Sequence, residues 1–399
     1  MGELSFWSWI KKMGNVRGNK YSNSKWDSTR IAAIVILVAI FVLSYCLIHF
    51  GLVQDEDDKS TSFFARAKVV SLIIDNTQSD ETTEGLLRGS QEVIIELTSG
   101  KFNGKQYQTS NYLSMLCNIN CKEGTRVIVR LDPRSEDEGY SAFIYSYDRT
   151  FILLGLFLVF ALSLMIIGRG KGTMSLLSLI FIMISVVGIL FPLIEYGFSA
   201  ILVTILIVFY TTVFTFVLID GINRKTISAA LGTLSGVVIA SVFAAIAGAL
   251  SHISGFQTNE AEELLLIGTD HGMKLKGLFT VGILIASLGA VMDVAMSIAS
   301  AIHELHEVND KMTAMELFHS GMNIGRDAMG TMANTLILAF AGSSFTLLLL
   351  IYYYNISFTQ LMNTDMVARE VIQGLSGSIG IVLTVPIVAI LSARIETLK

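Results

Sequence analysis

Long apolar blocks recur along this chain, and each is close to the length that a helix needs to cross a bilayer. At a rise of about 1.5 Å per residue, roughly 20 residues span the hydrocarbon core. Eight blocks fit, and they predict transmembrane helices over 31–52, 151–167, 174–194, 198–219, 227–250, 277–299, 331–354 and 371–391. Only 15% of the 399 residues are charged, against about 25% in soluble proteins. The chain is therefore predicted to be an α-helical polytopic membrane protein, with the seven later helices in a membrane domain over 151–393.

Lysine and arginine near the helix ends predict the orientation of the helices. The segment 1–30 carries six of them and is expected to stay in the cytoplasm. The block 31–52 is too long and too late in the chain for a cleavable signal peptide, so we interpret it as an anchor helix. Alternation then places the C-terminal segment 394–399 in the cytoplasm as well. In the short outer loops, only Lys274, Lys276 and Arg369 run against the rule.

Between the first two predicted helices lies a polar stretch, 55–148, which this topology places outside the cell. It contains 16 Asp and Glu and 10 Lys and Arg, a net charge of −6. Alternating runs such as AKVVSLII, EVIIELTS, TRVIVRLD and SAFIYSY predict β-strands. We expect a small extracytoplasmic all-β domain of four to six antiparallel strands, either an OB-like barrel or a sandwich.

Two cysteines of this outer domain, Cys117 and Cys121, lie four residues apart. That spacing can close a small disulfide loop in an oxidising compartment, but two free thiols explain it equally well. No nearby histidine or second cysteine pair completes a zinc site.

Small residues mark the faces where membrane helices approach closely. In the block 227–250 they recur every four residues, as Gly232, Gly236, Ala240, Ala244 and Gly248. The last block contains GLSGSIG, with Gly374, Gly377 and Gly380, followed by Pro386. Such stripes are typical of static packing and of sliding contacts, and sequence does not distinguish the two.

A carboxylate interrupts the block 277–299. Gly282, Ala286, Ala290, Asp293 and Ser297 follow one another at helical spacing, so we expect Asp293 to face neighbouring helices and not lipid. A charge at this depth costs about 2.5–3.5 kcal/mol on insertion scales and normally has a function. The alternative is a purely structural hydrogen bond to a neighbouring helix.

The stretch SGMNIGRDAMGTMANT (320–335) leads into the seventh predicted helix. On a helix it places polar side chains along one face, with Arg326 at its flank: Asn323, Asp327, Thr331 and Asn334. Asn334 and Thr331 could join Asp293 and Ser297 in an oxygen-rich cluster suited to a cation or a proton. Alternatively, Arg326 locks Asp327 or Asp293 in an ion pair.

The run HELHEVND follows Asp293 at the predicted cytoplasmic end. His303 and Glu307 are four apart and could chelate a metal from one helix face, with Glu304 beside them. Two histidines three residues apart do not form HExxH. The alternative for this run is a solvated helix end.

GAVMDVAMSIAS (289–300), SGMNIGRDAMGTMANTLILAFAG (320–342) and GINRKTISAALGTLSG (221–236) resemble the YibE/F family of bacterial multi-pass membrane proteins. The resemblance covers the chain from about Phe151 onward. It implies a bacterial plasma membrane protein. Five polar residues fall in the family motifs, namely Asp293, Asn323, Arg326, Asp327 and Asn334. The resemblance implies nothing specific about activity.

The sequence predicts a transporter or permease of an ion or small solute, coupled to a cation or proton through Asp293. Asn323, Arg326, Asp327 and Glu304 would form a gate or a structural polar cluster. The alternative is a membrane-anchored signalling or assembly protein whose outer domain binds a ligand or envelope partner. No GxSxG, HExxH or GxxxxGK[ST] motif occurs, so we expect no enzyme and no nucleotide-driven pump.

Expected partners are the lipid bilayer and an ion or small solute, without nucleic acid. The sequence suggests no cofactor other than a bound cation, and it does not decide whether the chain forms a homo-oligomer.

Overall fold

The computed structural model describes most of the chain, namely residues 34–39, 41–42, 44–45, 63–100, 102–115, 117–133, 140–253, 277–354 and 356–398. The predicted cytoplasmic segment 1–30, most of the predicted anchor 31–52, and Lys274 and Lys276 lie outside the described residues. The chain divides into two compact units, Gln54–Ile167 and Met1–Val53 together with Gly168–Lys399. Each is described by itself.

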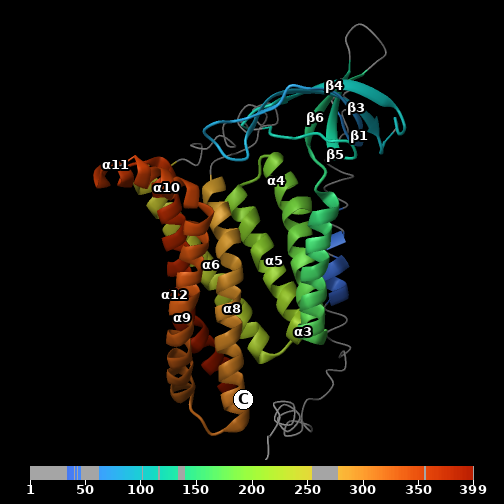
Figure 1. Ribbon diagram of the computed structural model, residues 1–399. Helices are drawn as coiled ribbons and strands as arrows, with labels where there is room; N and C mark the ends of the chain where they lie inside the picture. Colours follow the sequence, from blue (N-terminus) through green and yellow to red (C-terminus); the bar gives the residue numbers. More distant parts are fainter. Residues whose placement is uncertain are drawn as a thin grey trace, which may run out of the picture. The chain divides into compact units, whose positions relative to one another are not determined.

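The first unit contains a β half-barrel of six strands (Figure 1). Its strands are β1 (Phe63–Asp75), β2 (Gln78–Ser79), β3 (Leu87–Leu97), β4 (Gln106–Leu113), β5 (Arg126–Pro133) and β6 (Tyr140–Tyr147). The order is β2-β3-β1-β5-β6, and β4 also pairs with β3. All pairs are antiparallel.

Strict alternation explains this sheet. Ala65, Ala67 and Val69 of β1 are buried, while the residues between them are exposed. The four strands expected from the sequence are present as β1, β3, β5 and β6. Strand β4 was not foreseen because its sequence QYQTSNYL contains few apolar residues. Asn111 of β4 is buried, and its side-chain amide donates a 2.7 Å hydrogen bond to the carbonyl oxygen of Ile119, which satisfies this polar group inside the core.

The other regular elements of the described chain are helices. They are α3 (Thr150–Ser185), the π-helical turn η1 (Val186–Leu190), α4 (Phe191–Glu195), α5 (Ala200–Asp220), α6 (Arg224–Leu250), α8 (Leu278–Val308), α9 (Ala314–Ser343), α10 (Phe345–Tyr353), α11 (Phe358–Met362) and α12 (Asp365–Thr397). The second unit holds the helices that follow Ile167, including the bundle of α5, α6, α8, α9 and α12 (Figure 1).

Within the described residues, five helical stretches are long and apolar enough to cross a membrane, and six if the bent pair α9–α10 is one span. One of them, Thr150–Glu195, has 46 residues, about twice the length that a bilayer requires. It contains both predicted helices 151–167 and 174–194, separated at Arg169, whose backbone is non-helical (φ 49°, ψ −133°). The predicted total of eight stays a prediction.

The expected small-residue seam of α6 packs against α12. Gly232, Gly236 and Ala240 are all buried. A Cβ on Gly380 of α12 would stand 2.7 Å from the Cβ of Ala240 and 2.9 Å from the carbonyl oxygen of Gly236. Only glycine allows the two backbones to approach this closely, as the sequence pattern indicated.

Candidate functional site

Helix α8 crosses the second unit with one face in the core and one face outward. Leu284, Val291, Ile298 and Ile302 are completely buried against α6, α9 and α12. Burial of these large side chains fixes the rotation of the helix about its axis.

The opposite face of α8 carries the stripe that contains Asp293. Asp293, Ser297, Gly282 and Ala286 are exposed, and Ala290 is half-buried. Within the described residues, no atom lies within 4 Å of a Cβ placed on Gly282. The expectation that Asp293 faces neighbouring helices is therefore wrong for the described helices, because the large residues of α8 occupy the inner face. The described residues also give Asp293 no hydrogen bond or ion pair.

Helix α9 presents the predicted polar face, and this face is outward too. The exposed members are Asn323, Arg326, Asp327, Thr331 and Asn334. The guanidinium of Arg326 donates a 3.4 Å hydrogen bond to the side-chain oxygen of Asn323. Within the described residues Arg326 forms no ion pair with Asp327 or with Asp293, so neither carboxylate is locked by this guanidinium.

The packing of α8 against α9 fixes which polar residues share a level. Gly321 lies against Ile302, and a Cβ on Gly325 would stand 3.1 Å from Ile298. The two helices run in opposite directions. Five residues back from Ile298 on α8 is Asp293, and five residues forward from Gly325 on α9 is Gly330. Five residues correspond to about 7.5 Å along both axes. Asp293 is thus level with Gly330, and Thr331 lies one residue, about 1.5 Å, further along α9. No hydrogen bond joins Asp293 and Thr331 in the described chain.

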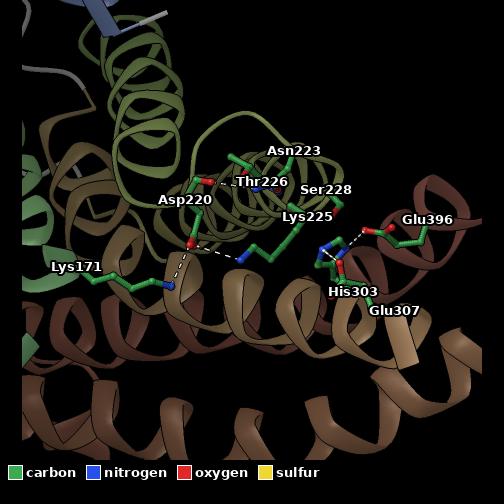
Figure 2. A network of polar contacts seen from close by, with 9 residues as sticks. All are labelled: Lys171, Asp220, Asn223, Lys225, Thr226, Ser228, His303, Glu307 and Glu396. Atoms are coloured by element: carbon green, nitrogen blue, oxygen red, sulfur yellow. Dashed lines mark hydrogen bonds and ion pairs between the residues drawn. The ribbon is translucent and has the colours of Figure 1, made fainter. Parts of the chain in front are cut away.

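At the C-terminal end of α8, a histidine links two carboxylates (Figure 2). His303 Nδ1 lies 2.9 Å from Glu396 Oε1 of α12, and its Nε2 lies 3.7 Å from Glu307 Oε1. The side chain of Glu396 is only 4% exposed. The pairing of His303 with Glu307 follows from their i, i+4 spacing, whereas the closer partner comes from the far end of the chain.

Beside this pair, a second ionic contact joins three segments (Figure 2). Asp220, the last residue of α5, accepts from Lys171 Nζ at 3.1 Å and lies 3.5 Å from Lys225 Nζ. Asn223 caps α6 by accepting a 2.8 Å hydrogen bond from the backbone of Thr226. Asp220 therefore anchors the turn between α5 and α6.

A polar hollow of about 430 Å³ opens at the same end of the bundle. Its lining includes Arg224, His306, Lys311 and Glu396. Arg224 donates a 2.9 Å hydrogen bond to the carbonyl oxygen of Glu396. Glu396 and Arg224 were both missed by sequence reasoning. Glu396 had a detectable signal, because it lies four residues after Ser392 and seven after Ala389, on the buried face of α12.

Metal-binding residues do not gather in the described chain. It holds no group of three or more His, Cys, Asp or Glu side chains placed to bind a metal ion, and the contacts of His303 with Glu307 and Glu396 do not form such a group. In the β half-barrel, Cys117 is exposed, Cys121 is buried, and both are free thiols. Burial raises the pKa of the Cys121 thiol to about 11.

Comparison with protein-family models gives a match over residues 156–397, to the family described as YibE/F-like protein. Neither the curated proteins nor the solved structures compared with the chain give a match. The matched region begins in α3 and ends with the last residue of α12. It therefore contains Asp293, the polar face of α9 and the His303–Glu396 pair.

Proposed function

The chain belongs to the YibE/F-like family, and from that premise we propose that it is a membrane transporter or permease of an ion or small solute. Its apolar helices and its family support a multi-pass membrane protein. We place it in the bacterial plasma membrane, with both termini in the cytoplasm and residues 55–148 outside. Transport, not catalysis, is the activity proposed.

The observation that carries the proposal is an unpaired carboxylate on a helix of membrane length. Asp293 is exposed on α8, and the described residues provide no partner for its charge. Leaving a carboxylate in hydrocarbon costs about 2.5–3.5 kcal/mol, so such groups normally contact water, protein or an ion. An exposed, unpaired carboxylate is what we expect of a group that binds a cation or proton in one state of the transport cycle and releases it in another.

Neutral oxygens at similar levels complete the proposed site. Ser297 lies one turn from Asp293 on the same exposed face of α8, and Thr331 and Asn334 are exposed on α9. Carboxylate, hydroxyl and amide oxygens are the ligands that hard cations prefer. Asp293 would exchange the coupling cation or proton, and the other three would provide neutral ligands.

A polar path leads from this site toward the C-terminal end of α8. Asp293, Ser297, Ser300 and Glu304 follow at spacings of four, three and four, so they share one face. On α9, Asn323, Arg326 and Asp327 lie toward the same end. We propose that Glu304 and these three residues form the mouth of the path, while His303 and Glu396 hold α8 and α12 together beside it.

Ion-driven proton movement in proteoliposomes tests this function. The purified chain is reconstituted around a pH-sensitive dye, and proton flux is followed after addition of Na⁺, K⁺, Mg²⁺, Ca²⁺ or Mn²⁺. We expect flux for at least one ion and a loss of at least about tenfold in Asp293→Asn, since one lost charge–ion contact is worth more than about 1.4 kcal/mol. Asp310→Asn, in the exposed turn after α8, is the matched control. Equal flux in wild type and Asp293→Asn would remove Asp293 from the mechanism.

A signalling or assembly function is the second candidate, and exposed aromatic side chains on the half-barrel favour it. Phe64, Tyr112 and Tyr145 are 55%, 73% and 57% exposed, and aromatic residues are enriched at interfaces. Deletion of 56–148 separates the candidates. Flux that survives the deletion supports transport by the helices alone. If the full chain gives no flux and the deletion causes an envelope defect, the assembly function is supported.

A further inference from the structure

Although the outer domain is acidic in sum, one face of its half-barrel is basic. Arg66, Lys68, Arg126 and Arg130 are all exposed; we call these four residues the basic face. Strand register explains why they gather. Lys68 pairs with Arg126 and Phe64 with Arg130 across β1 and β5, and alternate residues such as Ala67 point into the core.

Aromatic side chains lie among these cations. Phe64 packs edge-on against Tyr145 at 4.9 Å between ring centroids, and Arg130 lies over the ring of Phe143 at 5.7 Å. Phe64, Phe143 and Tyr145 are about half exposed. The surface thus combines guanidinium groups with aromatic rings, among them the amphipathic ring of Tyr145, a residue type enriched at the headgroup level of membranes.

Carboxylates only partly neutralise the basic face. Asp132 accepts from Arg130 at 2.9 Å, and Asp148 lies 3.7 Å from Arg66. Glu96 is the cross-strand neighbour of Lys68 but forms no ion pair with it in the described chain. Asp148 also accepts the backbone N–H of Thr150, and hydrogen bonds from Thr150 lower the pKa of that carboxyl. Lys68 and Arg126 have no ion-pair partner within the described residues.

The start of α3 lies next to this face. Both lie in the same compact unit, which ends at Ile167. The guanidinium groups of Arg66 and Arg126 lie 5.6 and 5.5 Å from the ring centroid of Phe151, in the first turn of α3.

From Phe151 the chain reads FILLGLFLVFALSLMII, without a charge. In the most apolar window of this helical stretch, only 6% of the residues are buried inside the structure. Hydrocarbon is the medium that such a surface requires. If this segment enters the bilayer at Phe151, the two guanidinium groups stacked on that ring lie at the depth of the lipid phosphates.

We propose that the basic face of the half-barrel docks on the phosphates of anionic phospholipids around α3. Arginine binds phosphate through two parallel hydrogen bonds, and Lys68 adds to Arg126 a second cation without an ion-pair partner in the described chain. The aromatic rings of Phe64 and Tyr145 rest at the boundary between headgroups and chains. This docking orients the half-barrel on the membrane, and it does not depend on what the helices transport.

Lysine reactivity in bilayers of defined composition tests the proposal on the intact chain. The protein is reconstituted in nanodiscs of phosphatidylcholine alone or with phosphatidylglycerol and treated briefly with an amine-acetylating reagent. Mass spectrometry then gives the rate at each lysine. Lys105 and Lys122 are exposed residues of the same half-barrel outside the basic face, and they are internal controls.

We expect Lys68 to react roughly fivefold more slowly in the anionic bilayer, as one surface cation–lipid contact predicts. The rates at Lys105 and Lys122 should stay unchanged. High salt should remove the protection, as should Arg126→Glu, while the matched charge reversal Lys122→Glu should leave it intact.

Three outcomes would overturn the proposal. Equal Lys68 rates in both bilayers exclude anionic lipid as the partner. Protection that persists in neutral lipid and high salt assigns the face to a protein partner or to another part of this chain. Equal slowing of all three lysines indicates unspecific attraction of the half-barrel.

Discussion

The small-residue stripes of α6 and α8 have similar sequences and opposite surroundings. On α6 the stripe of Gly232, Gly236 and Ala240 is buried, and Phe243 and Ile246 are exposed. On α8 the stripe around Asp293 is exposed, and Leu284 and Ile298 are completely buried. In a bilayer, large apolar side chains are accepted on either side of a helix. The position of small residues alone therefore does not identify the packed face.

The largest expected effect comes from filling the packed stripe. Gly380→Ala should lower the free energy of unfolding by about 3 kcal/mol, because the new methyl meets the backbone of Gly236, which cannot move aside. The measurement is the unfolding of the purified protein in detergent. Gly282→Ala is the control on the open stripe, where nothing lies within 4 Å. It should leave stability unchanged or raise it by up to about 1 kcal/mol through helix propensity. Equal effects of the two variants would mean that α8 is as tightly packed as α6.

A smaller loss of stability is expected from removing the partner of the buried Glu396 carboxylate. His303→Phe removes the 2.9 Å partner of the buried Glu396 and should cost about 2 kcal/mol, because a buried acceptor loses its donor. Thermal unfolding in detergent gives the difference. His319→Phe, at an exposed position of α9, should have an effect near zero. A stable His303→Phe protein would show that the Glu396 carboxylate finds another donor.

The smallest effect is expected at Asp293 itself. Asp293→Asn should change the free energy of unfolding by less than about 0.5 kcal/mol, since the described residues give its carboxylate no partner. The comparison variant is Asp220→Asn, which weakens contacts to Lys171 and Lys225 and should cost up to about 1 kcal/mol. Chemical unfolding in the same detergent orders the two. A loss above about 2 kcal/mol at Asp293 would reveal a structural partner and argue against an exchangeable ion site.

Sequence patterns predicted the parts of this fold that depend on local periodicity. The alternation of AKVVSLII predicted β1, and the four-residue repeat of α6 predicted its buried seam. The spacing of Asn323, Asp327 and Asn334 correctly placed them on one face of α9. That face points outward, and its direction depends on which neighbours α9 meets, which periodicity does not contain.

The contacts that sequence reasoning missed are those between distant segments. Glu396 meets His303 across 93 positions, and only the parallel packing of α8 and α12, which places their C-terminal ends side by side, brings them together. The basic face of the half-barrel was hidden for a related reason. A net charge of −6 over 55–148 averages over all surfaces, whereas strand register gathers Lys68 and Arg126 on one of them.

The hydrogen bond between His303 and Glu396 also decides how the bent pair α9–α10 must run. It places the end of α12 beside the end of α8, close to where α9 begins. Helix α12 has 33 residues and extends about 50 Å, so it starts at the opposite end of the bundle, where α10 and α11 lie (Figure 1). The chain must already have travelled that full length through α9 and α10. The 65° bend between α9 and α10 therefore comes after α9 has run along the bundle, at the end where α12 begins.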